Sequence, residues 1–149
     1  MNQLNRIEPA HIERLTPDQL IRLLNLLLHA EAKERLLAVH GIHVPFQINV
    51  PDGGRDGRWV ADIGEYEYIP RKISYYQSKA QSLSDSQCRA EILRTDEPGK
   101  YVLKEKVQEV LESGGAYVLF SSHPCVKIDE RIKACRDALR DAGRVNPEK

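Results

Sequence analysis

The sequence predicts a mixed α/β fold in which helices flank a mixed central sheet. Three features lead to this class. A long amphipathic helix pattern comes first, three short strand patterns follow it, and a nearly continuous apolar strand pattern lies between two later helices. The 149 residues suit one domain of ordinary size, and 41% apolar residues are enough for a core.

The first helix is predicted from a capping box in which Thr16 caps and Gln19 stands three positions later. Pro17 fits the first helical position. We expect the helix to end near His40, since Gly41 favours a left-handed stop. At about 100° per residue, its apolar face carries Leu20, Leu23, Leu24 and Leu27.

One acid interrupts this apolar face. Glu31 stands four positions after Leu27, near the middle of the stripe. A carboxylate that points into a core is costly unless a charge, a metal or several donors compensate it. Alternatively, the helix end emerges from the core and Glu31 is hydrated. The sequence leaves both interpretations open.

Three strands are expected over residues 42–50, 59–63 and 73–79, and they can pair as a meander. Turn-forming residues fill 51–57, and a turn or an extended excursion is expected over 64–71.

The remaining chain predicts helices around one strand. The expected elements are a helix over 85–94, an interruption at 95–99, a helix from Tyr101 to Gly114, a strand over 116–120 buried on both faces, and a helix over 129–142 with Ile132, Cys135, Leu139 and Ala142 inward. A polar tail or linker is expected over 143–149.

Charge and cysteine usage bound the function class. Basic and acidic residues both number 22, so the net charge is zero, which argues against a general basic coat for nucleic acid. Residues 1–70 hold 7 basic and 10 acidic side chains, whereas residues 71–149 hold 15 and 12. The positive excess therefore lies in the second half.

No apolar run approaches the roughly 20 residues that span a bilayer, and the first residues contain no apolar signal core. The three cysteines form no CxxC pair. We therefore expect a cytoplasmic protein with reduced thiols and without a membrane partner.

The richest group of polar side chains joins a glycine-rich turn to a strand. Gln77 and Lys79 point to one face because strand side chains alternate, and Asp56 lies beside them if the second and third strands pair. The Asp56 carboxylate and a carbonyl oxygen can hold Mg²⁺, and the Lys79 ammonium can orient a water or stabilise charge on phosphoryl oxygens. Each residue alone has an ordinary structural explanation, such as a turn Asp-Gly, and their joint placement favours a site.

The segments GGRDG (53–57) and YYQSKAQ (75–81) resemble the Mrr-like branch of the PD-(D/E)XK nuclease superfamily. In that branch an Asp-Gly follows a glycine-rich turn, and Q-x-K replaces the more common (D/E)-x-K. The order of helix, three strands, helix and strand resembles the core of the superfamily as well. The resemblance covers residues 17–142.

The resemblance implies a restriction-endonuclease-like αβββαβ core within a single domain, 1–149. It implies a Mg²⁺-dependent DNA endonuclease in which Mn²⁺ can substitute. Asp56 matches the acid, Gln77 the neutral replacement of the second acid and Lys79 the lysine. Glu31 lies on the helix where an additional glutamate is expected. The implied catalytic residues are thus Asp56, Gln77, Lys79 and Glu31, and the implied metal ligands are Asp56, Gln77 and Glu31.

One departure from the pattern matters. The spacing from Asp56 to Gln77 is longer than is usual in this branch. Either the hairpin over 64–71 is extended, or Asp62 is the acidic ligand instead, although Asp62 is not followed by glycine. The long spacing and the uncharged Gln77 are the best support for the alternative, a catalytically inactive nuclease-fold module for nucleic-acid binding or assembly.

The resemblance also suggests partners. Several similar domains are effectors fused to bacterial antiphage NTPases of the STAND type, which implies a homo-oligomer when active and double-stranded DNA as substrate. Candidate nucleic-acid contacts are Arg55, Arg58, Arg71, Lys72 and Gln81, with Arg89, Arg94, Lys100, Lys104 and Lys106 as further basic residues. The alternative for most of the later lysines is an ordinary solvated helix face.

Overall fold

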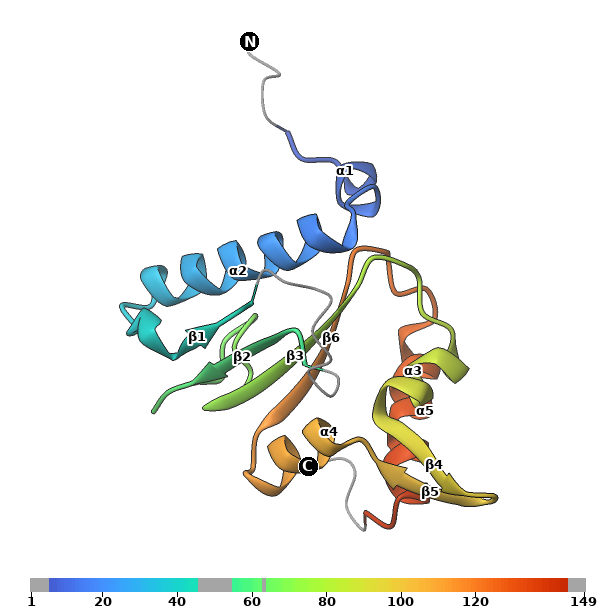
Figure 1. Cartoon of the computed structure of the whole chain (residues 1–149). Helices are drawn as coiled ribbons and strands as arrows, with labels where there is room; N and C mark the ends of the chain where they lie inside the picture. Colours follow the sequence, from blue (N-terminus) through green and yellow to red (C-terminus); the bar gives the residue numbers. More distant parts are fainter. Residues whose placement is uncertain (1–5, 46–54, 63, 145–149) are drawn as a thin grey trace.

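The computed structural model describes residues 6–45, 55–62 and 64–144 (Figure 1). The predicted class, a mixed α/β fold with helices flanking a mixed sheet, is confirmed. The elements in chain order are α1 (Pro9–Glu13), α2 (Pro17–Glu34), the 3₁₀ helix η1 (Val39–Gly41), β1 (Ile42–His43), β2 (Gly57–Val60), β3 (Ile73–Lys79), α3 (Asp85–Ile92), β4 (Leu93–Glu97), β5 (Lys100–Leu103), α4 (Glu105–Glu112), β6 (Ala116–Ser121) and α5 (Ile128–Asp141).

The central sheet has the strand order β1-β2-β3-β6. The first three strands are antiparallel neighbours, as the predicted meander requires, and β6 runs parallel to β3. A parallel pair needs a long crossover, which α3, the β4–β5 hairpin and α4 supply. The carboxyl ends of β3 and β6 therefore meet at one edge of the sheet, where Lys79 stands opposite Ser121.

Helix α2 covers one face of the sheet. Thr16 and Gln19 form the predicted capping box, and Leu20, Leu24 and Leu28 are at most 1% exposed. The cluster that packs between α2 and the sheet also contains Trp59 of β2 and Tyr76 of β3. Burial of side chains of this size supplies most of the driving force for folding.

The other face is covered by the elements that follow β3. Helix α4 packs on β3 and β6, and α3 packs on α5. In Figure 1, α2 and α4 lie on opposite sides of the sheet. A second apolar cluster lies among these elements. It has fewer buried residues than the first cluster, namely Ile92, Leu93, Val107 and Ala138.

Several predicted boundaries change. Helix α2 ends at Glu34 rather than near His40, because Leu36 adopts a left-handed φ of 56° and the chain continues into η1. The predicted helix from Tyr101 is wrong at its start, since 100–103 form β5 and α4 begins at Glu105. Gly99, at φ 81°, reverses the chain between β4 and β5.

The burial of the last elements differs from the prediction too. Strand β6 is half-buried along its length rather than buried on both faces. Helix α5 buries Ala134 and Ala138, whereas Ile132 is 41% exposed. Residues 46–50 of the first predicted strand and 145–149 of the predicted tail lie outside the described residues. Within the described ranges, no helix combines the length and the apolar character that crossing a membrane requires.

Candidate active site

Strand pairing brings Asp56 to β3. Its backbone N–H donates to the Tyr76 carbonyl at 2.7 Å, one residue before the first ladder pair, Gly57 with Tyr76. The Asp56 carboxylate then accepts three hydrogen bonds at Oδ2, from Gln77 Nε2 (2.9 Å), Ser78 N (2.7 Å) and Ser78 Oγ (2.9 Å). The sequence predicted Gln77 beside Asp56, and the geometry agrees.

Ser78 is a contact that the sequence did not predict. Strand alternation places its side chain on the face opposite Gln77. Asp56, however, lies just before the first residue of β2, so its carboxylate reaches the backbone N–H and the hydroxyl of Ser78 together. The Ser78 contacts fix the carboxylate at the edge of the strand.

Gln77 carries a buried acceptor that its surroundings do not satisfy. The side chain is 8% exposed, and Oε1 is buried without a hydrogen-bond partner among the described residues. Exchanging the amide ends would place Oε1 against the Asp56 carboxylate, so the bond from Nε2 sets the orientation. An unsatisfied buried acceptor costs about 1–3 kcal/mol, and a bound donor or cation would remove that cost.

Lys79 ends β3 and lies in an ion-pair cluster. Its Nζ is 2.9 Å from Glu91 Oε1, and Lys104 Nζ is 3.6 Å from Glu91 Oε2. Glu91 belongs to α3, and Lys104 is the N-cap residue of α4. The lysine is therefore tied to both segments of the crossover rather than extended into solvent.

Sequence reasoning missed Glu91, although a signal existed. Glu91 lies three residues after the buried Cys88 and one before the buried Ile92, so it stands near the inward face of a short helix. The same pattern, a carboxylate near the apolar face of a helix, distinguishes Glu31 on the first helix.

Glu31 is buried, at 6% exposure, so of the two interpretations that the sequence left open the hydrated helix end is wrong. It pairs with Arg35, whose Nε is 3.3 Å from Glu31 Oε1. Its charge also raises the pKa of Tyr76, a phenol whose pKa is already raised by burial. Tyr76 points toward α2, on the opposite face of β3 from Gln77 and Lys79. The interactions described for Glu31 are with Arg35 and Tyr76 on the α2 side rather than with Gln77 and Lys79, and we leave Glu31 out of the site.

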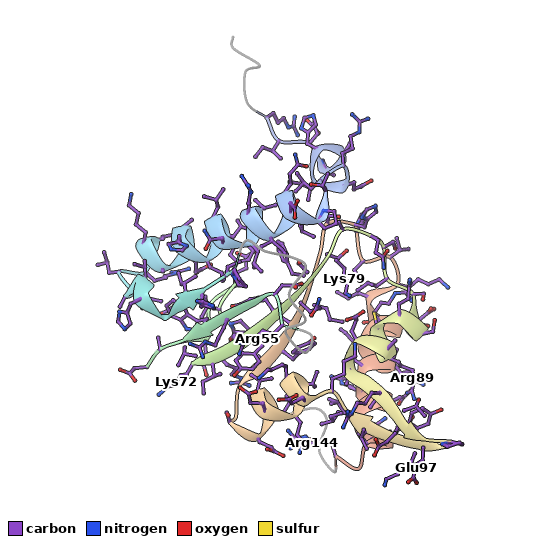
Figure 2. All side chains as sticks on the ribbon, viewed as in Figure 1. Arg55, Lys72, Lys79, Arg89, Glu97 and Arg144 are labelled. Atoms are coloured by element: carbon purple, nitrogen blue, oxygen red, sulfur yellow. The ribbon has the colours of Figure 1, made fainter. Side chains whose placement is uncertain are left out.

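Three of the predicted nucleic-acid contacts come from the segment around β2 and from the chain just after β3. The Arg55 guanidinium lies over the Tyr75 ring, 4.9 Å from its centroid, and Figure 2 labels it near the middle of the sheet. Arg58 is half-buried on β2, and its Nε is buried without a partner in the described chain. Gln81 is exposed just after β3, and its carbonyl accepts a bond from Ser121 Oγ at 2.9 Å.

The other two basic candidates lie at the opposite end of β3, as Figure 2 shows for Lys72 and Lys79. Arg71 and Lys72 precede the strand, and at about 3.3 Å per residue they stand roughly 20 Å from Lys79. They line a polar cavity of about 490 Å³ together with Asp62. Asp62 is thus remote from Gln77, and the structure brings Asp56 rather than Asp62 to the strand motif.

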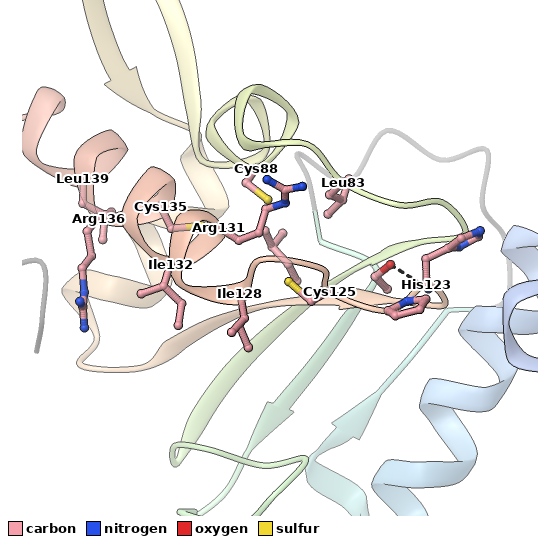
Figure 3. Close-up of a pocket in the computed structure, with 13 residues that line it drawn as sticks. Leu83, Cys88, His123, Cys125, Ile128, Arg131, Ile132, Cys135, Arg136 and Leu139 are labelled. Carbon is pink, nitrogen blue, oxygen red and sulfur yellow. Dashed lines mark hydrogen bonds between the residues drawn. The ribbon is translucent and has the colours of Figure 1, made fainter. Parts of the chain in front are cut away.

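A second cavity, of about 370 Å³, lies between α3, α5 and the loop after β6 (Figure 3). Its lining is mainly apolar and includes Cys88, Cys125 and Cys135. Burial raises the pKa of Cys135 to about 11, with a further contribution from the neighbouring Cys88. Asp56, Gln77 and Lys79 do not line this cavity, so it is separate from the candidate active site.

The oxygen atoms of Asp56 and Gln77 are of the kind that binds a hard cation. A carboxylate and a buried amide oxygen are ligands that Mg²⁺ prefers, and the orphaned Gln77 Oε1 calls for such a partner. Among the described residues, no three His, Cys, Asp or Glu side chains group closely enough to hold a metal. A metal here would therefore depend on amide, backbone and water oxygens in addition to Asp56.

No protein-family model, curated protein or solved structure matches this chain.

Proposed function

We propose that this chain is a Mg²⁺-dependent endonuclease domain built on a restriction-endonuclease-like αβββαβ core. The order α2, β1, β2, β3, crossover helix and β6 supports this core, as does the parallel pairing of β3 with β6. Val60 and Ile73 form the last pair of the β2–β3 ladder, and a long connection joins them. The length of this connection accounts for the unusual Asp56 to Gln77 spacing.

The observation that carries the proposal is the buried Gln77 amide, whose Nε2 donates to the Asp56 carboxylate while its Oε1 has no hydrogen-bond partner among the described residues. Asp56 and Gln77 would hold Mg²⁺ (or Mn²⁺), which when bound polarises a phosphodiester and lowers the pKa of a coordinated water. Lys79, on the same face of β3 as Gln77, would orient the attacking water and stabilise the charge on the phosphoryl oxygens. Ser78 would hold Asp56 in place.

The substrate we propose is double-stranded DNA. Arg55, Arg58 and Gln81 would contact the backbone near the cleaved bond, and Arg71 with Lys72 would contact it roughly 20 Å away along the strand direction. Because its net charge is zero, the domain alone would bind DNA weakly. We therefore propose that it acts as a homo-oligomer, as a cytoplasmic effector assembled by a larger antiphage or restriction NTPase.

The second candidate function is a nuclease-fold module that binds nucleic acid or assembles without turnover. Two observations favour it. Asp56 Oδ2 already accepts three hydrogen bonds, and Lys79 is ion-paired with Glu91. Both contacts would have to yield in part for a metal and a phosphate to enter.

One experiment separates the two functions. Supercoiled plasmid is incubated with Mg²⁺ or Mn²⁺ and high concentrations of the wild type, Asp56→Ala or Lys79→Ala. The endonuclease predicts metal-dependent nicking by the wild type and a loss of about 100-fold or more in each variant. Wild-type cutting that survives both substitutions would reject the site. DNA binding without cutting, even when the chain is fused to an oligomerising partner, would favour the inactive module.

A further inference from the structure

The lysine of the candidate site is one member of a charge cluster that spans three elements. Glu91 of α3 offers one oxygen to Lys79 at 2.9 Å and the other to Lys104 at 3.6 Å. The three side chains are partly sheltered, with exposures of 15% for Glu91, 25% for Lys79 and 29% for Lys104. Partial burial weakens the screening by solvent, so this cluster is stronger than the exposed pairs on the helix surfaces.

Removing the acid would release both cations. Without Glu91, two ammonium groups that share one carboxylate would face each other, and like charges at this range repel. Lys79 ends its strand on a flexible four-carbon stem, so it would take other rotamers, directed into solvent. The position of the Lys79 ammonium thus depends on Glu91 more than on the strand.

Glu91 is poorly placed to be a metal ligand itself. Each of its oxygens lies within 4 Å of an ammonium group, and it comes from a helix rather than from the strand ends that carry Asp56 and Gln77. Its contacts are with the cations that would bind a phosphate.

We infer that Glu91 is the positioning residue of the site, which holds the Lys79 ammonium at the edge of the sheet for a phosphodiester oxygen or its attacking water. This inference rests on the proposed nuclease function, since Lys79 has no reaction to serve without it. Lys104 belongs to the same cluster and supports Glu91 from the start of α4.

The first test measures the ion pair without any assay of cutting. The full chain is treated briefly with an amine-acylating reagent, and mass spectrometry quantifies the modification of each lysine. In Glu91→Gln, modification of Lys79 should rise several-fold over the wild type. The matched control is Asp137→Asn, which removes the same charge from the exposed pair of Asp137 with Lys133 and should leave Lys79 unchanged.

The second test measures plasmid cutting with Mg²⁺. Glu91→Gln should lower kcat by about tenfold or more, with KM for DNA within about twofold, because positioning affects the reacting complex more than binding. Glu91→Asp, which keeps the charge on a shorter stem, should recover part of the loss. Lys79→Met gives the rate of cutting without the Lys79 ammonium, and Asp137→Asn should cut at the wild-type rate.

The outcomes separate the two proposals. Unchanged Lys79 modification in Glu91→Gln overturns the inference, and so does cutting at the wild-type rate by a Glu91→Gln variant when Lys79→Met is inactive. If the wild type does not cut but Lys79 modification rises in Glu91→Gln, the nuclease function fails and the Glu91–Lys79 pairing stands. Circular dichroism checks each variant for folding, and Glu91→Asp replaces Glu91→Gln if the latter does not fold.

Discussion

The two faces of the central sheet differ in what they bury. The α2 face holds large apolar side chains such as Leu24, Trp59 and Tyr76, all at most 1% exposed. The opposite face of β3 carries Tyr75, Gln77 and Lys79, and each contacts a carboxylate. Tyr75 contacts Glu109 of α4, Lys79 contacts Glu91 of α3, and Gln77 contacts Asp56. One face of the sheet thus supplies stability, and the other places polar groups where a reaction could use them.

The alternation of a single strand produces this division. On β3, Tyr76 points to α2, whereas its neighbours point to the crossover elements. Packing against α2 holds the strand in place from one side, so the stability of the sheet does not depend on the polar side chains of the other side. Three substitutions test this difference between the two faces.

The largest effect is expected on the apolar face. Leu24→Ala should lower the free energy of unfolding by about 2–5 kcal/mol, because it removes a side chain that is 1% exposed and leaves a cavity. Leu26→Ala on the same helix, at 66% exposure, is the control and should change it by less than about 0.5 kcal/mol. Urea denaturation measures both, and equal effects would contradict the described packing of α2.

A smaller effect is expected at the candidate site. Gln77→Glu replaces the donor to Asp56 with a second carboxylate, which should lower the free energy of unfolding by about 1–3 kcal/mol when divalent ions are absent. Millimolar Mg²⁺ or Mn²⁺ should restore the loss, since two carboxylates bind a cation more strongly than one.

The control for this change lies on the surface. Gln108→Glu places the same new charge beside Glu112, its hydrogen-bond partner on α4, where solvent screens the repulsion. Thermal unfolding with and without metal measures both variants. A Gln77→Glu protein that Mg²⁺ does not stabilise would count against a metal beside Asp56.

The smallest effect is a dependence on pH. Hydrogen bonds from Lys106 and Tyr75 hold the pKa of Glu109 below its ordinary value of 4.5. A lowered pKa in the folded state adds stability above the unfolded pKa, and this stability is lost as the pH falls through the folded value. The difference in unfolding free energy between wild type and Glu109→Gln should therefore be greatest above pH ~5 and close on further acidification. A constant difference across this range would contradict the pairing.

The sequence predicted the strongest local patterns correctly. The Thr16 capping box and the strand over 73–79 follow from residue type and spacing. The contact of Asp56 with Gln77 was expected only if the second and third strands pair, and they do. The β4–β5 hairpin was missed because Tyr101 and the residues after it also fit a helical period, and only the pairing with β4 selects the strand. The burial of Ile132 was overestimated, since helix periodicity does not show which neighbours are present.

Residue types and their spacing were sufficient to predict the amphipathic first helix, the order of the strands around the glycine-rich turn, and the placement of Gln77 and Lys79 on one side of β3. These depend on local periodicities and turn residues, which act within a few positions. Packing of the whole chain was needed to show that Glu31 is buried, at 6% exposure, and that Lys79 of β3 pairs with Glu91 of α3. The physical reason is that ion pairs and burial join residues far apart in the chain, and their geometry is set by how the sheet and helices pack.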